Sequence, residues 1–313
     1  MSWQNLFITW ALRRWVKPGS LLTQSVAASR ARTERVPFGA KLESGWRIRV
    51  VRDGPFGGEW IEPVAADHPA HAKCVLYLHG GAYIAMSART HRSMTSRLAC
   101  GGEARLFALD YRLAPEHPFP AAVDDALTAW RQLVASGTPP SRIVVAGDSA
   151  GGGLALALLI ALRDAGDEMP AGAVLFSPWT DLAATGDSIV ANDAADPLFF
   201  GRWVAPVARH YLGDTPATHP LASPVYADLT GLPPLLIQVG DTEVLLDDSR
   251  RVAEHATRDG VPVTLRVWPG VPHGWHIFAP VLPEARDALR EASVFIRERL
   301  NLRTRTPGAP LPG

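Results

Sequence analysis

The sequence predicts an α/β fold with a mostly parallel central sheet, helices on both faces of the sheet and a helical cap. Short continuous apolar runs, which are typical of strands buried on both faces, alternate along the chain with stretches of helical periodicity. Alternation of this kind favours parallel strands joined by helices. Two amphipathic segments lie outside the alternation, one before it and one within it, and we assign both to the cap.

The chain is expected to begin with a helical and loop-rich segment over residues 1–42, broken at Pro18-Gly19. Four large apolar residues recur there at helical spacing: Trp3, Leu6, Phe7 and Trp10. We expect the face that they form to be buried against the rest of the protein. A helix that lies on a membrane surface is the alternative, which we do not favour because its polar face is not strongly basic.

The same segment gives an expectation about location. Its first apolar run is too short to span a bilayer, and the basic residues follow that run, whereas in a secretory signal they precede it. We therefore expect a soluble, cytoplasmic protein with no stable membrane insertion.

Eight strands are expected after this segment. Two are short and antiparallel, at 46–51 and 59–63, because Asp53-Gly54-Pro55 and Gly57-Gly58 supply turn residues between them. The other six are continuous apolar runs: 74–78, 105–109, 143–145, 173–176, 235–239 and 263–267. The exposed edge of the last strand could pair across a two-fold axis and form a homodimer.

The connections between the apolar strands carry helical patterns, as an apolar stripe over 123–134 and a nearly all-apolar run over 154–162. The connection from residue 176 to residue 235 is too long for a single crossover. Five of its residues share one helical face: Phe200, Trp203, Val204, Val207 and Tyr211. We predict an insertion at about 183–216 that forms the cap together with residues 1–42, within a single domain over 1–313. The proline-rich tail over 306–313 is expected to be frayed.

The composition excludes several classes of function. Thirty-one basic residues balance thirty-one acidic ones, so the zero formal charge offers no electrostatic footprint for nucleic acid or for an anionic membrane. We therefore expect an uncharged small-molecule substrate. Cys74 and Cys100 are expected to be packing residues, because two cysteines make neither a disulfide scaffold nor a cysteine-rich metal site. His68, His71 and His117 lack metal-ligand spacing, and no cofactor is expected.

Ser149 stands in the sequence Gly147-Asp148-Ser149-Ala150-Gly151, between a predicted strand and a predicted helix. A serine on so sharp a turn exposes its hydroxyl above the sheet, and glycines at 147 and 151 leave room for the reversing chain. This pattern predicts a nucleophile elbow. A glycine-rich turn with an N-capping serine is the structural alternative.

A second glycine-containing loop, His79-Gly80-Gly81-Ala82-Tyr83, follows the strand 74–78. Residues without side chains allow main-chain N–H groups to point at a tetrahedral oxygen, and we predict Gly80, Gly81 and Ala150 as the oxyanion-hole donors. His79 is expected to be a structural hydrogen-bonding residue. A plain Gly-Gly turn is the alternative.

The acid of a serine-based site is expected in the loop after strand 235–239. Asp247 and Asp248 are assigned to the first turn of the next helix, where negative charge is favourable. Asp241 and Glu243 are left, and we favour Glu243 because an acid that reaches an imidazole belongs a few residues beyond the strand. Asp241 stays open as its rival.

Two histidines compete for the role of base in the loop after strand 263–267. We favour His273, which precedes Gly274 on the loop, over His276, which is expected to lie in the following turn. The chain order Ser149, Glu243, His273 is the order in which α/β hydrolases carry their serine, acid and histidine.

Three motifs of the chain resemble the hormone-sensitive lipase family of α/β hydrolases, also called the bacterial family IV esterases. They are His79-Gly80-Gly81, the pentapeptide around Ser149, and the segment Asp-Tyr-Arg-Leu-Ala-Pro-Glu-His-Pro-Phe-Pro-Ala over 110–121, which is the most specific. The resemblance covers about 72–300. It implies an α/β-hydrolase fold and hydrolysis of short to medium acyl-chain carboxylic esters, without cofactor and beneath a cap.

In the family, the segment over 110–121 braces the oxyanion loop, and Arg112 and Glu116 are expected to form an ion pair that fixes it. The sequence departs from the family pattern at two places. It has Glu243-Val244-Leu245 where Asp-Pro-Leu is common, which keeps Asp241 as a rival. Ala82 stands where a third glycine is frequent, and this should cost little if the φ angle of Ala82 is negative.

The predicted mechanism is two-step acyl transfer, in which His273 deprotonates Ser149 and Glu243 orients the imidazole. Four further residues are expected to contact the substrate: Tyr83, Asp148, Phe200 and Trp203. Hydrolysis of a lactone or an activated amide by the same residues is the enzymatic alternative. A non-enzymatic small-molecule receptor would require a broken triad, and we do not favour it.

Overall fold

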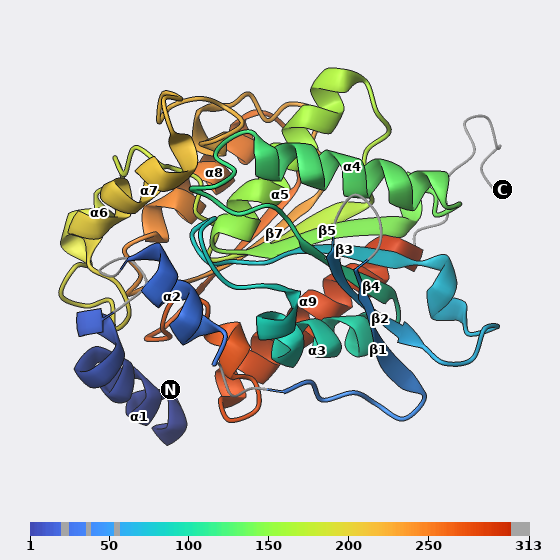
Figure 1. The fold of residues 1–313 in the computed structure, drawn as a ribbon, viewed down its shortest axis with the longest axis horizontal. Helices are drawn as coiled ribbons and strands as arrows, with labels where there is room; N and C mark the ends of the chain where they lie inside the picture. Colours follow the sequence, from blue (N-terminus) through green and yellow to red (C-terminus); the bar gives the residue numbers. More distant parts are fainter. Residues whose placement is uncertain (20–24, 36–38, 53–56, 302–313) are drawn as a thin grey trace, which may run out of the picture.

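The computed structural model describes residues 1–19, 25–35, 39–52 and 57–301 of the 313-residue chain. Within this part an eight-stranded sheet forms the centre, in the order β1-β2-β4-β3-β5-β6-β7-β8 (Figure 1). The strands are β1 Trp46–Val51, β2 Gly57–Pro63, β3 Cys74–Leu78, β4 Arg105–Asp110, β5 Ile143–Asp148, β6 Gly172–Phe176, β7 Leu235–Gly240 and β8 Val263–Trp268. All eight predicted strands are therefore present.

The pairing confirms a mostly parallel sheet. β2 is antiparallel to both β1 and β4, and every other neighbouring pair is parallel. β8 lies at an edge of the sheet, as expected, and pairing of that edge in a homodimer stays a prediction. The predicted turn at Asp53-Gly54-Pro55 and the tail over 306–313 lie outside the described residues.

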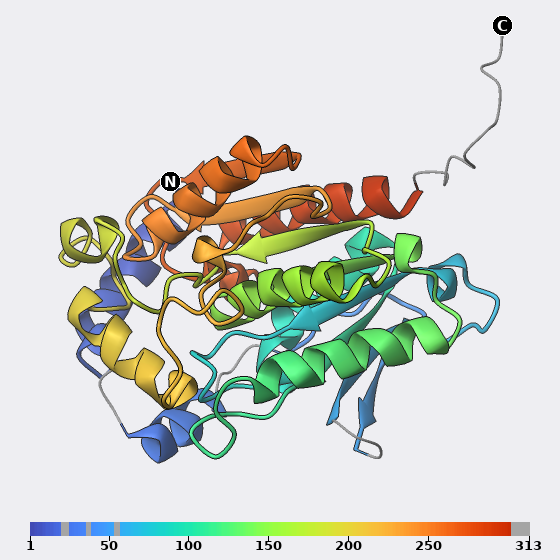
Figure 2. The same cartoon turned by 90° about the horizontal axis from the view of Figure 1, so that it is seen from above.

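Helices cover both faces of the sheet (Figure 2). One face carries α3 Arg92–Gly102 and α9 Pro283–Asn301, and the other carries α4 Ala121–Ala135, α5 Ala150–Ala165 and α8 Leu246–Arg258. Side chains alternate along each strand, so Val144 and Ala146 of β5 pack with the α3 and α9 cluster while Ile143 and Val145 pack with the other. This burial on both faces explains the continuous apolar runs.

Shorter helical elements complete the described part of the chain. They are α1 Trp3–Ala11, a π-helical turn Leu12–Val16, α2 Val26–Thr33, α6 Ser188–Ala191, α7 Val204–Leu212, and 3-10 turns at Lys17–Gly19, Pro69–Ala72, Ala88–His91, Pro140–Arg142, Gly201–Trp203, Pro224–Tyr226 and Trp275–Phe278. No helix in the described ranges is long and apolar enough to cross a membrane.

The N-terminal segment and the insertion lie together at one end of the sheet, where Figure 1 shows α1 and α2 beside α6 and α7. The Arg13 guanidinium donates to the carbonyl oxygen of Ala195 at 2.8 Å. Lys17 is buried, and its Nζ donates to the carbonyl oxygens of Asp193 and Asp196 at 2.5 and 2.7 Å. These hydrogen bonds join the two segments that we assigned to the cap.

The expectation that α1 buries its apolar face is wrong. Four of its apolar side chains are more than half exposed: Trp3 at 73%, Leu6 at 57%, Phe7 at 56% and Trp10 at 53%. The helix buries Asn5, whose Nδ2 donates to the carbonyl oxygen of Gly270 at 2.9 Å. Its N-cap residue Ser2 donates through both its N–H and its hydroxyl to the Glu284 carboxylate. Hydrogen bonds from Ser2 and Asn5, with Ile8 as the one apolar residue of α1 that packs against a core cluster, therefore hold the helix in place.

The predicted ion pair between Arg112 and Glu116 is also wrong. The Arg112 guanidinium lies 2.8 Å from Oδ1 of Asp125, a buried residue of α4 that also accepts the N–H of Arg112. Glu116 is half exposed and pairs with Arg30 of α2 at 2.6 Å. Arg30 also donates to the carbonyl oxygens of Ile84 and Ala114. Both partners are far away in sequence, so the local spacing of Arg112 and Glu116 was uninformative.

Candidate active site

Ser149 occupies the corner between β5 and α5 in a strained backbone conformation, with φ of 53° and ψ of −121°. Its N–H donates to the carbonyl oxygen of Phe176 at 2.8 Å, which fixes the corner against β6. A Cβ added to Gly147 would collide with the carbonyl of Gly151, and one added to Gly151 would collide with the carbonyl of Leu78. The prediction that these two glycines leave room for the turn is confirmed.

Gly80 was predicted as an oxyanion donor, and the structure assigns its N–H elsewhere. That N–H donates to Oδ1 of Asp148 at 2.9 Å. A Cβ on Gly80 would collide with the same carboxylate, so glycine is needed here for close approach to Asp148. Gly80 is therefore a brace between two loops and has no free N–H for an oxyanion.

The next two residues of this loop take the position expected of Gly80. Gly81 and Ala82 line the same cavity as Ser149, and in the described part of the chain their N–H groups donate to no other group. Ala150 follows Ser149 and begins α5, where the first N–H groups lack intrahelical acceptors. The arrangement leaves the N–H groups of Gly81, Ala82 and Ala150 as candidate donors.

Ala82 has a φ angle of 55°, which contradicts the expected negative value. The left-handed conformation continues at Tyr83, with φ of 63°, and returns at Met86, with φ of 71°. The loop reverses so sharply here that the N–H groups of Ile84 and Ala85 both donate to the carbonyl oxygen of Gly81, at 3.0 Å each. An L-residue in this region is strained, so alanine at position 82 does carry a conformational cost.

The segment over 110–121 contacts the oxyanion loop directly. The Tyr111 hydroxyl donates to the carbonyl oxygen of His79 at 2.7 Å, and the N–H of Ala114 donates to that of Tyr83 at 2.9 Å. His79 is buried, stacks on Tyr111 with ring centroids 4.3 Å apart, and has a pKa lowered by burial to about 4. It is a neutral structural residue, as expected.

The structure brings Glu243 and His273 together. Oε2 of Glu243 lies 2.6 Å from Nδ1 of His273, and the glutamate side chain is completely buried. Its other oxygen, Oε1, accepts from the Ser177 hydroxyl at 2.7 Å and from the N–H of Gly240 at 2.6 Å. Because hydrogen bonds to both oxygens fix the orientation of the Glu243 carboxylate, the His273 imidazole is also held in one position on the cavity wall.

The environment of His273 favours its protonated form. Burial lowers the pKa of the imidazole, but the carboxylate of Glu243, by charge and by hydrogen bond, outweighs burial and raises the pKa above 6.5. The Phe199 ring packs 5.0 Å from the imidazole ring and restricts it further. With Nδ1 directed at Glu243, Nε2 is the nitrogen that can accept a proton.

The two rival residues lie elsewhere. Asp241 is exposed, and its Oδ1 accepts from the N–H of Gly270, so that it joins the loops after β7 and β8. His276 is completely buried in the 3-10 turn Trp275–Phe278, where its Nε2 lies 2.9 Å from Oε1 of Gln238. Burial lowers the pKa of His276 to about 3. Neither side chain lines the cavity of Ser149.

Asp148 was predicted to contact substrate, and its carboxylate is occupied by protein donors. Besides the N–H of Gly80, Oδ1 accepts from the Tyr77 hydroxyl at 2.6 Å, and Oδ2 lies 3.3 Å from Nε2 of His91. Burial raises the pKa of this carboxyl, but His91 and the hydrogen bonds outweigh it and hold the pKa well below 3.8. Asp148 is therefore an ionised residue of the cavity lining whose carboxylate links Tyr77, Gly80 and His91.

A cavity of about 400 Å³ contains the candidate catalytic groups. Its walls are mostly apolar and come from the oxyanion loop, the N-terminal segment, the insertion and the loops after β6 and β8. Among the lining residues are Leu12, Val16, Met86, Trp179, Leu198, Phe199, Val204, Ile277 and Phe278. Such a pocket suits an uncharged apolar group next to the nucleophile.

Three predicted substrate contacts do not line this cavity. Tyr83 is buried and stacks on Tyr211 with ring centroids 3.7 Å apart. Phe200 faces Lys17 and Arg202, whose charged groups lie 4.4 and 4.3 Å from its ring centroid, and Trp203 is 37% exposed. The insertion lines the cavity through Leu198, Phe199 and Val204, of which only Val204 belongs to the predicted helical face.

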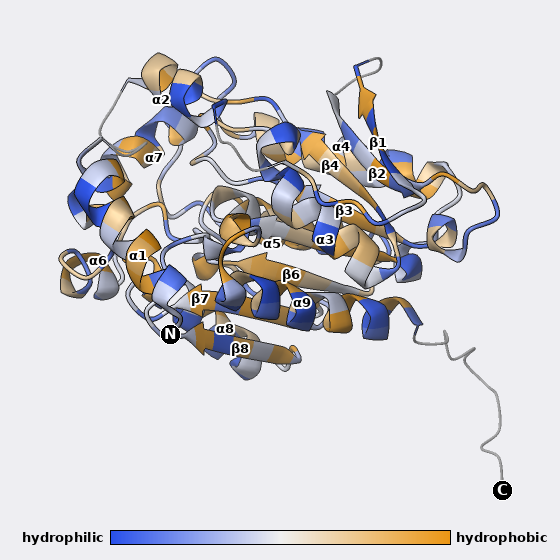
Figure 3. Ribbon diagram, turned by 90° about the horizontal axis from the view of Figure 1, so that it is seen from below, coloured by the Kyte–Doolittle hydropathy of each residue, from blue (hydrophilic) through white to orange (hydrophobic). Residues whose placement is uncertain are grey.

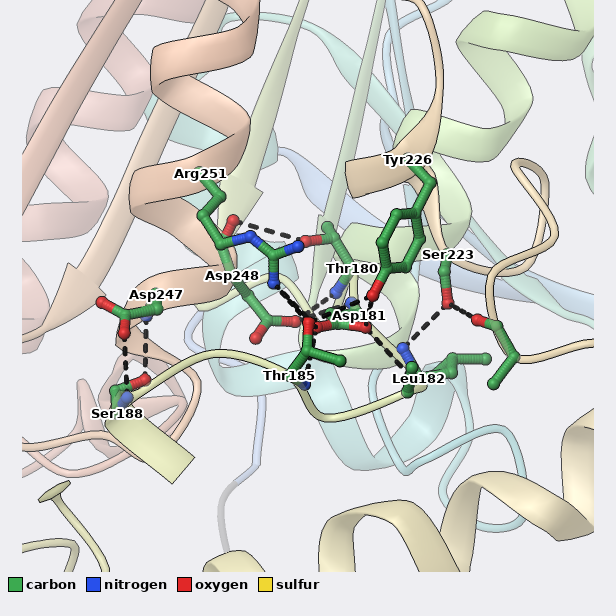
Figure 4. A network of polar contacts seen from close by, with 12 residues as sticks. Thr180, Asp181, Leu182, Thr185, Ser188, Ser223, Tyr226, Asp247, Asp248 and Arg251 are labelled. Carbon is green, nitrogen blue, oxygen red and sulfur yellow. Dashed lines mark hydrogen bonds and ion pairs between the residues drawn. The ribbon is translucent and has the colours of Figure 1, made fainter. Parts of the chain in front are cut away.

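A polar network holds the loop after β6, which begins with Ser177, against α8 (Figure 4). Oδ2 of Asp248 accepts the N–H groups of Thr180 and Asp181 at 2.7 and 2.8 Å. Asp181 in turn pairs with Arg251 at 2.7 Å. Burial, followed by the charge of Asp181, raises the pKa of Asp248 to about 8. Asp248 lies in the first turn of α8, as predicted, and that helix begins three residues after Glu243.

Sequence reasoning missed four residues that shape the site: Ala82, Ser177, Asp196 and Phe199. Asp196 is completely buried, and its carboxylate accepts the N–H groups of Leu198, Phe199 and Val244. It thereby ties the lining residues of the insertion to the loop of Glu243. Only Ala82 could have been found from the sequence, because it directly follows Gly80-Gly81 in the predicted oxyanion loop. The roles of the other three depend on contacts between distant segments.

Known proteins resemble this chain in sequence and in structure. A family model described as alpha/beta hydrolase fold matches residues 75–277. An acetyl-hydrolase of Streptomyces hygroscopicus is 49% identical over 248 residues, which cover 79% of this chain and 82% of that protein. A crystal structure of EstE5 soaked with p-nitrophenyl butyrate has a TM-score of 0.88 and 41% identity, covering 96% of this chain and 99% of that one. An esterase from the bacterial hormone-sensitive lipase family has a TM-score of 0.86, with the same identity and coverage.

Proposed function

The chain belongs to the α/β-hydrolase family, in the hormone-sensitive lipase family of bacterial esterases, and we propose that it hydrolyses short to medium acyl-chain carboxylic esters with Ser149 as nucleophile. The observation that carries the proposal is the convergence of three separate loops on one cavity. Ser149, His273 and the N–H groups of Gly81 and Ala82 all border it. This is the set of groups that acyl transfer to a serine requires.

In the proposed first step, Nε2 of His273 takes the proton of the Ser149 hydroxyl while the serine oxygen attacks the ester carbonyl. Glu243 holds the imidazole in the tautomer with Nδ1 protonated and offsets the charge of the imidazolium. The imidazolium then gives its proton to the departing alcohol, which leaves an acyl-enzyme. Water repeats the sequence on the acyl-enzyme and releases the acid.

The negative charge of each tetrahedral intermediate falls on the former carbonyl oxygen. We assign its stabilisation to the N–H groups of Gly81, Ala82 and Ala150. Asp148 contributes indirectly, since its hydrogen bond to Gly80 holds the oxyanion loop next to the elbow. Donors fixed before the reaction need no reorganisation when the charge develops, which is why such a loop lowers the barrier.

The cavity supports the substrate class. Its mostly apolar walls and volume of about 400 Å³ accommodate a short to medium acyl chain, although Arg32 and Arg35 are also among the lining residues. Two similar proteins support short acyl chains: one is called an acetyl-hydrolase, and crystals of the other, EstE5, were soaked with a butyrate ester.

We also propose that the N-terminal segment and the insertion act as the cap within one domain. Leu12 and Val16 from the first, and Leu198, Phe199 and Val204 from the second, line the cavity. The same proposal places the enzyme in the cytoplasm, which a cell-fractionation experiment would test. 

Hydrolysis of p-nitrophenyl acetate and butyrate by the purified chain tests the proposed nucleophile. Ser149→Ala is expected to lower kcat by about a thousandfold or more, with the urea unfolding midpoint retained. Ser136→Ala, which changes a serine outside the cavity, serves as the matched control and should keep wild-type activity. Hydrolysis by Ser149→Ala at the rate of this control would end the proposal.

A further inference from the structure

The N-terminal helical segment carries large apolar side chains that are exposed to solvent. Figure 3 shows α1 at one end of the sheet, close to α6. We call the following residues, each more than half exposed, the aromatic face: Trp3, Leu6, Phe7, Trp10 and Trp15. The ring of Trp10 lies 5.9 Å from that of Phe7 and 4.8 Å from that of Trp15, so these three rings form one contiguous patch. A contiguous exposed apolar patch of this kind marks a surface that is covered in function.

This exposure does not reflect a loosely attached helix. Ser2 is bound to Glu284, Asn5 to Gly270 and Lys17 to the insertion, all through hydrogen bonds on the inner side of the segment. The helix is thus fixed with its polar residues inward and its aromatic residues outward. A soluble surface helix normally has the opposite arrangement, so the aromatic face is a built feature of the fold.

The charge of the segment indicates what covers it. Residues 1–33 contain five basic residues and no acidic one, although the whole chain has a formal net charge of zero. The basic residues are Arg13, Arg14, Lys17, Arg30 and Arg32. Lys17 is buried, Arg30 pairs with Glu116 and Arg32 lines the cavity, so Arg13 and Arg14 are the charges available beside the aromatic face. Arg13 and Arg14 are exposed and directly precede Trp15 of the aromatic face. An aromatic face flanked by exposed arginines is complementary to a surface that is apolar inside and anionic at its boundary.

The aromatic face also belongs to the same short segment as part of the cavity wall. Leu12 lies between Trp10 and Trp15 in sequence, is buried, and lines the cavity that contains Ser149, as does Val16. One side of the segment therefore borders the cavity and the other meets solvent. Whatever binds the aromatic face is held next to the cavity.

We propose that the aromatic face docks on a bilayer surface that contains anionic phospholipid. The indole and phenyl rings enter the headgroup region, where aromatic side chains with a polar edge are favoured, and Arg13 and Arg14 contact lipid phosphates. The docking is peripheral, since the segment is too short to span a bilayer. A convex helix that offers separate rings and flanking arginines fits a fluid lipid surface better than a preformed protein groove.

Binding to sucrose-loaded vesicles tests this proposal. Vesicles of equimolar phosphatidylcholine and phosphatidylglycerol are compared with vesicles of phosphatidylcholine alone, and bound protein is measured by sedimentation. The wild-type chain should bind the anionic vesicles, and the triple variant Trp3→Gln/Phe7→Gln/Trp10→Gln should bind about tenfold less. The matched control Val50→Gln/Val64→Gln removes exposed apolar side chains outside this segment and should bind as wild type. Arg14→Gln should weaken binding and reduce its dependence on salt.

Activity on soluble p-nitrophenyl butyrate separates this proposal from the proposed function, because none of the three substituted residues lines the cavity. The triple variant should keep the wild-type kcat/KM on that ester while its binding to anionic vesicles decreases. Failure of wild type to sediment with anionic vesicles overturns the docking, as does equal binding by wild type and triple variant. Light scattering in which wild type is a dimer and the triple variant a monomer, with no vesicle binding, would assign the aromatic face to a second copy of the chain and also overturn the proposal.

Discussion

The N–H of Gly80 donates a hydrogen bond of 2.9 Å to Oδ1 of Asp148, the residue directly before Ser149. The same buried carboxylate binds the Tyr77 hydroxyl and faces His91. A single side chain thus fixes the oxyanion loop relative to the nucleophile corner. Because the N–H of Gly80 is already bound, we propose the N–H groups of Gly81 and Ala82 as the oxyanion donors of this loop.

Removal of the Asp148 carboxylate should therefore impair catalysis more than substrate binding. Asp148→Ala leaves the N–H of Gly80 and the hydroxyl of Tyr77 without this acceptor, at a cost of about 1–3 kcal/mol each in a buried site. We expect kcat on p-nitrophenyl butyrate to fall about tenfold to a hundredfold with little change in KM. Asp148→Asn keeps an acceptor oxygen and should recover part of the loss. Wild-type kcat in the alanine variant would contradict the bracing role.

Ala82→Gly should stabilise the protein. Glycine adopts the left-handed conformation of position 82, with φ of 55°, without the steric cost that alanine bears there. We expect the free energy of unfolding to rise by about 1 kcal/mol, measured by urea denaturation. Ala85→Gly is the matched control in the same loop. It lacks a positive φ angle and should destabilise the protein by a similar amount or more. A lower unfolding midpoint for Ala82→Gly would show that no strain is stored at this position.

The pH profile should identify the acid. His273 must be neutral to take the serine proton, and its pKa is raised above 6.5, so kcat/KM should fall as the pH decreases through that raised value. Glu243→Gln removes the charge that raises the pKa and leaves the burial that lowers it. We expect the acidic limb of the residual activity to move to lower pH, together with a loss of about a thousandfold or more in kcat at alkaline pH.

Asp241→Asn is the matched control for this prediction, because Asp241 follows β7 as Glu243 does but is exposed and bound to Gly270. It should leave both kcat and the acidic limb unchanged. If Asp241→Asn, and not Glu243→Gln, shifted the limb and lowered kcat, the acid would have to be reassigned.

Asp248 should make the protein less stable as the pH rises. Burial and the charge of Asp181 raise its folded-state pKa to about 8 from 3.8, so its contribution to stability is complete below pH 3.8 and is lost as the pH rises through about 8. Asp248→Asn keeps an acceptor for the N–H groups of Thr180 and Asp181 and cannot ionise. Its urea midpoint should therefore fall less than that of wild type over this pH range, whereas Asp124→Asn, at an exposed position, should follow wild type. Parallel curves for wild type and Asp248→Asn would refute the assignment.

The sheet and the nucleophile corner could be predicted from local sequence for a physical reason. A strand buried on both faces admits few polar residues, so β3 to β7 read as apolar runs, whereas the edge strand β8 has no fully buried residue. A corner as sharp as that at Ser149 needs glycine at 147 and 151. The acid and the histidine of the candidate triad could be predicted because they follow the serine in the chain order of α/β hydrolases.

Apart from the φ angle of Ala82, the predictions that went wrong depended on which residues meet in the folded chain. The N–H of Gly80 is bound by a carboxylate 68 residues away, and Arg112 turns to Asp125 of α4 instead of the nearby Glu116. The aromatic face of α1 has the periodicity of a buried helix, but the anchor residues Ser2 and Asn5 hold its polar side inward. Helical spacing shows that a face is apolar, and only the tertiary contacts show which side of the helix is buried.

Covalent labelling by a serine-directed organophosphate, read by intact mass and peptide mapping, tests whether Ser149 is the nucleophile and His273 its base. We expect a single adduct on Ser149, rapid in wild type and in His276→Ala and about a thousandfold slower in His273→Ala, because His273 lines the cavity of the serine and His276 does not. An adduct on another residue, or labelling that persists in His273→Ala and disappears in His276→Ala, would contradict it.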